Sequence, residues 1–371
     1  MCAASWSDKD PGLQYAHEAW VVDTKDKTRL GQLCAANNIQ GVLTTGTDVA
    51  IQSIGHICDS LNLPGISYQT AVAATDKKTM HDKFLEFGVP SAQYIDVSDW
   101  PDAVQAITKL GLPAIIKAPD SSGSRGIFII DELSDLQEAY TQSMQISRCG
   151  YVLIEEYISG EEFGAQAIVM DGEIALLILH NDTVTAPPVR VPVGHSVPFS
   201  MDRCIEQQAA EVCQKGVQAI AIDQGVCNID LLYDGQQVFM LEIGARIGAT
   251  GIPEIIDLTY GLDLYEIALD LCLGEIPDLN MQPQTAAANQ IIQAPQNGIL
   301  RHIHTPPDAY QAPGVVSIHF DTRPGEYVRR FSTGPDRIGE VRCSALSAGQ
   351  AEALCRHVIS QIQLTIDQAE D

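Results

Sequence analysis

The chain has 371 residues, of which 45% are hydrophobic and 19% charged, and its formal net charge at pH 7 is −26. This length predicts two or three structural units, and the composition excludes a largely disordered protein. The acidic balance argues against a nucleic-acid or anionic-membrane partner, because phosphate groups would be repelled.

The ten cysteines are scattered, and several lie among apolar neighbours. This pattern indicates free, buried thiols in a reducing compartment. No apolar run reaches about 18 residues, and the polar N-terminal stretch is not typical of a signal peptide. We therefore expect a soluble, cytoplasmic protein, and a homodimer is compatible with the sequence.

The first 75 residues alternate short apolar strands with helical stretches. We predict strands at 19–23 and 41–46, and helices at 28–38 and 48–62, the second helix being capped by Asp48. This order implies a parallel, Rossmann-like sheet. Such a unit normally opens with a strand and a glycine turn, whereas here a polar leader precedes residue 19, so we expect a lobe shortened at its first strand.

The rest of the chain alternates helices and strands. We predict helices at 75–90, 132–146 and 201–222, and strands at 113–118, 126–131, 151–158, 164–172 and 173–180. Two further strands, CNIDLLY and VFMLEIG, would form a hairpin. Residues 281–288 are typical of a linker, and the remainder would form a small closing module.

A strand that ends in Lys117 is followed by a loop rich in serine and glycine and then by another strand. Small residues such as Ser122, Gly123 and Ser124 let backbone N–H groups approach phosphate oxygens, and Lys117 adds a positive charge. The sequence does not match a Walker A loop. An ordinary polar hairpin is the alternative interpretation.

The stretch VLIEEYISGEEF places two glutamates at the end of an apolar strand. A solvated strand end is one interpretation. The functional interpretation is an adenine-binding hinge, in which backbone groups of Glu156 and Ile158 pair with the purine edge. Glu155 would then accept from the amino group, and Glu162 would hold the ribose hydroxyls.

Asp230 and Glu242 lie on the two arms of the predicted hairpin. A two-residue turn would place these carboxylates on opposite faces, whereas a three-residue loop at 234–236 would place them diagonally on one face. Carboxylates on one face suit Mg²⁺ that bridges nucleotide phosphates. The metal hypothesis therefore requires the three-residue loop.

Three basic side chains are candidate contacts for a carboxylate or phosphoryl group. Arg246 follows the hairpin and could clamp such a group with two hydrogen bonds, or it could pair with Asp230 or Glu242. Arg190 and His195 lie in a proline-rich segment beside the expected pocket. A structural role for the histidine is the alternative.

In this order and spacing, these motifs resemble the ATP-grasp superfamily, and more narrowly its L-amino-acid ligase and biotin carboxylase-like branch. TDKKTM resembles the start of a family helix from which Lys77 would reach the phosphates, and the stretches around 113–126, 151–162 and 226–250 resemble the loop, hinge and metal hairpin. The family often has Asn two residues after the second metal carboxylate, where this chain has Gly244. That ligand would be lost, or supplied by water or Asn228.

The resemblance implies an α/β ATP-grasp fold (with α+β lobes) and four parts. These are a truncated Rossmann-like domain (1–74), a subdomain with the glycine-serine loop (75–148), a subdomain with the hinge and metal hairpin (149–281), and a lid-like C-terminal module (282–371).

It also implies a carboxylate–amine ligase that uses ATP with Mg²⁺ or Mn²⁺, forms an acyl phosphate and releases ADP and phosphate. The substrates would be small carboxylates and amines, amino acids among them. A carboxylase-type or kinase-type enzyme and a non-catalytic ATP-binding subunit are the alternatives.

Overall fold

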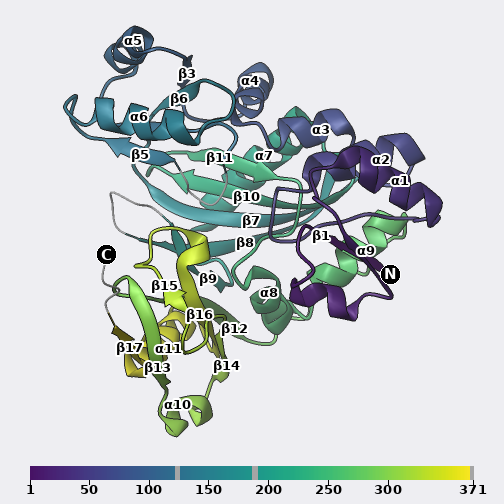
Figure 1. The fold of residues 1–371 in the computed structure, drawn as a ribbon, viewed down its shortest axis with the longest axis vertical. Helices are drawn as coiled ribbons and strands as arrows, with labels where there is room; N and C mark the ends of the chain where they lie inside the picture. The colour runs from purple at the N-terminus through teal and green to yellow at the C-terminus, as the bar shows by residue number, and fades with distance from the viewer. Residues whose placement is uncertain (122–125, 186–190, 368–371) are drawn as a thin grey trace.

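The computed structural model describes residues 1–121, 126–185 and 191–367. Its described strands form sheets of two, four, eight and three strands (Figure 1). None of the helices in this part of the chain combines the length and the apolar character needed to span a bilayer.

The N-terminal lobe contains two parallel strands, β1 (Cys2–Ser5) and β2 (Glu18–Val21), joined through the 3-10 helix η1 (Pro11–Tyr15). The prediction that the lobe lacks a strand before residue 19 is therefore wrong. The apolar run CAAS pairs along its whole length with β2, from Cys2 opposite Glu18 to Ser5 opposite Val21. The helices α1 (Lys27–Ala36), α2 (Ile51–Leu61) and α3 (Tyr68–Ala73) complete the lobe.

The strand predicted at 41–46 is also wrong, because only Thr45 makes an isolated parallel bridge, to Ile247. Gly41 instead packs so closely on α9 (Leu264–Leu273) and the residues around it that a Cβ atom would lie 2.4 Å from the carbonyl oxygen of Cys272. Asp48 does not cap α2, whose N-cap is Ala50, because its carboxylate binds Arg246.

The four-stranded sheet is antiparallel, in the order β3 (Tyr94–Val97), β6 (Val152–Glu156), β4 (Ala114–Lys117) and β5 (Ile127–Ile130). Helices α5 (Trp100–Leu110) and α6 (Leu136–Ile146) pack on it around an apolar core. Helix α4 (Lys77–Phe87) lies within the range predicted for it, 75–90. It begins where Asp76 accepts from the Thr79 N–H, and it ends at Gly88 in the left-handed region.

The eight-stranded sheet is the largest element of the fold. Its order is β11 (Val238–Gly244), β10 (Gly225–Tyr233), β7 (Glu161–Met170), β8 (Glu173–Val184), β9 (Pro192–Val197), β12 (Ala286–Gln293), β16 (Arg337–Ala345) and β14 (Val315–Phe320). Helix α7 (Arg203–Ile220) packs with one face in an apolar cluster. Helices α8 (Ile252–Tyr260) and α9 cover part of the opposite face.

The predicted linker is shorter than expected, because Ala286–Ala288 open strand β12 and are at most 2% exposed. Their small side chains fill a central position between β9 and β16. The eight-stranded sheet thus contains strands from both sides of the expected boundary at 281/282. Strand β6 was expected in the second subdomain, but it pairs in the four-stranded sheet with strands of the first. The four-part division stays a prediction.

The remaining C-terminal elements pack on one apolar cluster. They comprise the three-stranded sheet β15 (Tyr327–Val328), β13 (Gly298–His304) and β17 (Gln363–Asp367), with α10 (Pro307–Gln311), η2 (Gly334–Asp336) and α11 (Ala348–Gln361).

Candidate active site

The hairpin of β10 and β11 presents Asp230 directly opposite Glu242. The loop that joins the strands has four residues, 234–237, so the predicted three-residue loop is wrong. A bulge after Asp230 shifts the register by one residue and places the two carboxylates opposite each other. Because directly paired residues share a face, the bulge brings about the arrangement for which the three-residue loop seemed necessary.

Glu242 lies among basic side chains. The Nζ of Lys77, at the start of α4, lies 3.2 Å from its carboxylate and also donates to the Ser121 carbonyl at 3.1 Å. Burial alone would raise the pKa of Glu242, but the charges of Lys77, Lys117 and Arg246 lower it. The four-stranded sheet, α4 and the hairpin therefore meet at this carboxylate.

Asp230 has the opposite electrostatic setting. Loss of hydration, together with the negative charges of Glu242 and Asp182, raises its pKa to about 7. The side chain accepts from Asn228 Nδ2 at 2.9 Å. Two facing carboxylates, one of them reluctant to ionise, form a donor set that fits a divalent cation, because the cation would relieve their repulsion.

Gly244 occupies the position at which the family often has asparagine, and a different asparagine lies opposite it. Asn228 pairs directly with Gly244 across the hairpin. Its Oδ1 accepts from Gln166 Nε2 at 2.7 Å, and Gln166 Oε1 accepts from the Gly248 N–H at 2.8 Å. The replacement of that ligand by Asn228 stays a prediction, and the register makes it geometrically reasonable.

Lys117 forms a buried ion pair with Glu155, with Nζ 2.6 Å from Oε1. His81 Nε2, from α4, lies 2.9 Å from the same oxygen. Burial alone would raise the pKa of Glu155, but Lys117 and His81 lower it to about 2. The side chain that was expected to accept from adenine is therefore engaged with two basic groups, one of them the expected phosphate lysine.

This network gives a pH prediction. Because the folded-state pKa of Glu155 lies below its ordinary value of 4.5, its stabilising contribution is present above that value and is lost as pH falls toward about 2. Thermal unfolding over this range should show a steep loss of stability that Glu155→Gln makes shallower. Glu161→Gln, at an exposed position in β7, should leave the profile unchanged, and parallel profiles for all three proteins would contradict the assignment.

Arg246 is held by the N-terminal lobe. Its Nε and one terminal nitrogen lie 2.9 and 3.1 Å from the two oxygens of Asp48. The expected structural partners were Asp230 and Glu242, but the bidentate partner is Asp48, which the sequence analysis assigned to a helix cap. Arg246 remains close enough to Glu242 to lower the pKa of that carboxyl.

The other predicted residues are placed as follows. The Glu156 N–H donates to the Gln93 carbonyl at 3.0 Å, and its carboxylate accepts from the Gln93 N–H at 2.9 Å. Ile158 follows β6, and Glu162 lies in β7 opposite Leu232. Their hinge role stays a prediction. Ser122, Gly123, Ser124 and Arg190 lie outside the described residues.

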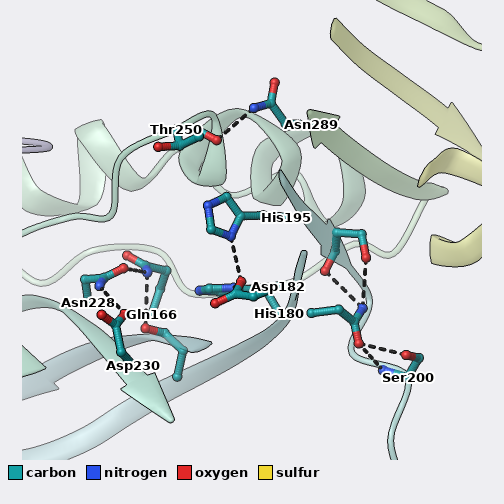
Figure 2. Close-up of polar contacts among 12 residues, drawn as sticks. Gln166, His180, Asp182, His195, Ser200, Asn228, Asp230, Thr250 and Asn289 are labelled. Carbon is teal, nitrogen blue, oxygen red and sulfur yellow. Dashed lines mark hydrogen bonds and ion pairs between the residues drawn. The ribbon is translucent and has the colours of Figure 1, made fainter. Parts of the chain in front are cut away.

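His195 lies in β9, 6% exposed, and contacts Asp182 (Figure 2). It is on the same sheet face as Asp230 and Glu242. Four polar residues on this sheet face were not predicted from the sequence: Gln166, His180, Asp182 and Asn289. A polar residue at alternate positions of an otherwise apolar strand was the signal that could have identified them.

Two models of known protein families match parts of this chain. Residues 110–254 match the model described as ATP-grasp domain, and residues 290–367 match that described as L-amino acid ligase C-terminal domain 2. Residues 110–254 are therefore an ATP-grasp domain. The predicted fold class is thereby confirmed, as the structural neighbours below also indicate.

Three similar proteins illustrate the likeness. An L-arginine-specific L-amino acid ligase of Bacillus subtilis is 23% identical over 85% of this chain and 78% of its own length. The structure of an L-amino acid ligase from Bacillus licheniformis has a TM-score of 0.85 at 18% identity, over 99% of this chain and 92% of that one. A biotin carboxylase domain from Hydrogenobacter thermophilus, solved with MgADP and bicarbonate, has a TM-score of 0.74 at 14% identity, over 95% and 82%.

Proposed function

We propose that this ATP-grasp protein is a carboxylate–amine ligase that activates a carboxylate as an acyl phosphate and joins it to an amine, with release of ADP and phosphate. The observation that carries the proposal is the convergence of Asp230 and Glu242, on one face of the hairpin, with Lys77 and Arg246. The match of residues 290–367 to an L-amino acid ligase domain supports amino acids as substrates.

The chain's own residues would act by position and charge. Lys77 and Lys117 would bind nucleotide phosphates, and each would exchange a carboxylate partner, Glu242 or Glu155, for a phosphate oxygen. Asp230 and Glu242 would hold Mg²⁺, which when bound neutralises phosphate charge. Arg246, oriented by Asp48, would contact the transferring phosphoryl group or the substrate carboxylate. No covalent catalysis by the protein is required.

The test is ADP release from MgATP in the presence of single amino acids and pairs of amino acids, with product masses determined. We expect ADP release that depends on a carboxylate–amine pair, and one amide formed per ADP. ADP release with one carboxylate alone and a stable phosphorylated product would favour the kinase-type alternative. Bound ATP without turnover for every pair would favour a non-catalytic ATP-binding subunit.

A further inference from the structure

A carboxylate and two imidazoles form a buried cluster on β8 and β9. Oδ1 of Asp182 lies 2.8 Å from His180 Nδ1 and 2.6 Å from His195 Nδ1. All three side chains are at most 8% exposed. Asp182 and His195 are directly paired in the sheet. The rings of His180 and His195 meet edge to face, with their centroids 5.3 Å apart. The sheet register therefore fixes the cluster.

The state of Asp182 determines where the histidine protons lie. Burial alone would raise its pKa, but the two imidazoles outweigh burial and hold it below the usual range. An ionised carboxylate can only accept, so each Nδ1 carries a proton and donates it. A neutral His195 then has an unprotonated Nε2, which can accept a proton.

The cluster lies beside the proposed metal carboxylates. Glu242, Asp230, Gly164 and His180 are successive direct partners across β11, β10, β7 and β8, so they share one face. Gly164 packs against His180, since a Cβ atom there would lie 2.3 Å from the ring. Asp182 is close enough to Asp230 to raise the pKa of the latter. A substrate that reaches the hairpin therefore lies near this cluster.

The two histidines differ in their surroundings. Nε2 of His180 is buried and has no hydrogen-bond partner among the described residues. In Figure 2 the second nitrogen of His195 is turned away from Asp182. The segment after β11 is tied to this face, where Thr250 accepts from Asn289 Nδ2, and Asn289 is the direct partner of His195. Of the two rings, His195 is the more exposed, at 6% against 1% for His180, so we infer that it is the one a substrate can contact.

Charged groups on the described elements that pack against β9 surround His195. They include His180 and Asp182 on β8, Asp230 on β10, and Arg342 with Glu340 on β16 beyond Asn289. The helices add Glu254 on α8, which lies 3.8 Å from Arg342, and Glu352 on α11, which accepts from the neighbouring Ser196. The nearest of them is Asp182, whose Oδ1 lies 2.6 Å from His195 Nδ1.

We propose that His195 is the base that deprotonates the attacking amine, and that Asp182 is the positioning residue that sets its tautomer. The inference rests on the proposed ligase function. The ammonium form of the amine gives one proton to Nε2, and the freed lone pair forms the C–N bond. The acyl C–O bond breaks, and phosphate leaves with that electron pair and takes up the second nitrogen proton. One proton stays on the amide.

The test compares two nucleophiles with one activated carboxylate. An amino acid needs a base at neutral pH, whereas hydroxylamine is largely unprotonated there and needs none. In Asp182→Asn the amide can donate to Nδ1, which moves the ring proton to Nε2 and removes the base. We expect the amide-forming kcat to fall by about 10²–10⁴-fold in Asp182→Asn and His195→Gln, while hydroxamate formation changes by less than about threefold.

The loss of amide-forming kcat in Asp182→Asn and His195→Gln should become smaller as pH rises toward the pKa of the amine, by about tenfold per pH unit. At such pH values the free amine forms without a base. Exposed His319 lies 3.4 Å from Asp321 with the same i, i+2 spacing as His180 and Asp182, so His319→Gln and Asp321→Asn are matched controls that should leave both products unchanged. Thermal melting and ATP binding of each variant identify proteins that merely fail to fold.

Equal loss of amide and hydroxamate in folded variants would overturn the base assignment. A stoichiometric transition metal in the purified protein that disappears in His195→Gln would also overturn it, because the cluster would then be a metal site. A wild-type protein that forms neither product from any carboxylate fails the proposed ligase function instead, which distinguishes the two outcomes.

Discussion

Replacement of Glu242 by glutamine should lower MgATP-dependent turnover by about 10³-fold or more, while nucleotide binding without metal changes by less than about threefold. Glu242 lies opposite Asp230 and within 3.2 Å of Lys77. Loss of its charge removes one of the two proposed metal carboxylates, and the proposed phosphoryl transfer depends on both. Nucleotide affinity can be measured by calorimetry with and without Mg²⁺, and turnover by ADP release.

Glu161→Gln is the matched control, since Glu161 is an exposed glutamate on a neighbouring part of the same sheet. It should retain wild-type turnover. Equal losses of metal-free nucleotide binding and of turnover in Glu242→Gln would contradict the metal assignment and indicate a role in adenosine binding or folding.

Lys117→Met should destabilise the apo protein by about 3 kcal/mol, because Glu155 then remains a buried carboxylate that keeps only the contact with His81 among those described above. The double variant Lys117→Met with Glu155→Gln removes both charges and should recover most of this loss. It should not recover ATP binding if Lys117 binds phosphate. Urea unfolding and nucleotide titration on the three variants separate the two roles.

If the double variant binds ATP as tightly as the wild type, Lys117 serves the fold and not the nucleotide. If the single variant is as stable as the wild type, His81 alone compensates Glu155, and the ion pair contributes little.

Local signals predicted the elements that carry Lys77 and Lys117 well. Asp76 and Gly88 bound α4 as their capping preferences indicate, and the strands on either side of the serine-glycine loop lie where apolar runs predicted them. These features depend on residues close in sequence, so hydrophobic periodicity and capping residues are sufficient to predict them.

Features that depend on distant residues were predicted poorly. The bulge after Asp230 leaves no recognisable signal in the hairpin sequence. Asp48 has the sequence signature of a helix cap, and its contact with Arg246 joins residues 198 positions apart. Alanines 286–288 have the composition of a linker, yet small side chains are what a tightly paired central strand can accept there.

The pairing of β9 with β12 has a practical consequence for engineering. Because the C-terminal strands extend the sheet that carries the carboxylate hairpin, a chimera cut between residues 281 and 282 would graft a foreign strand against His195. Such exchanges should replace β9 and β12 together, with both strands taken from the same parent protein. A donor segment joined elsewhere would carry its own inter-strand register into the strand pair that holds His195.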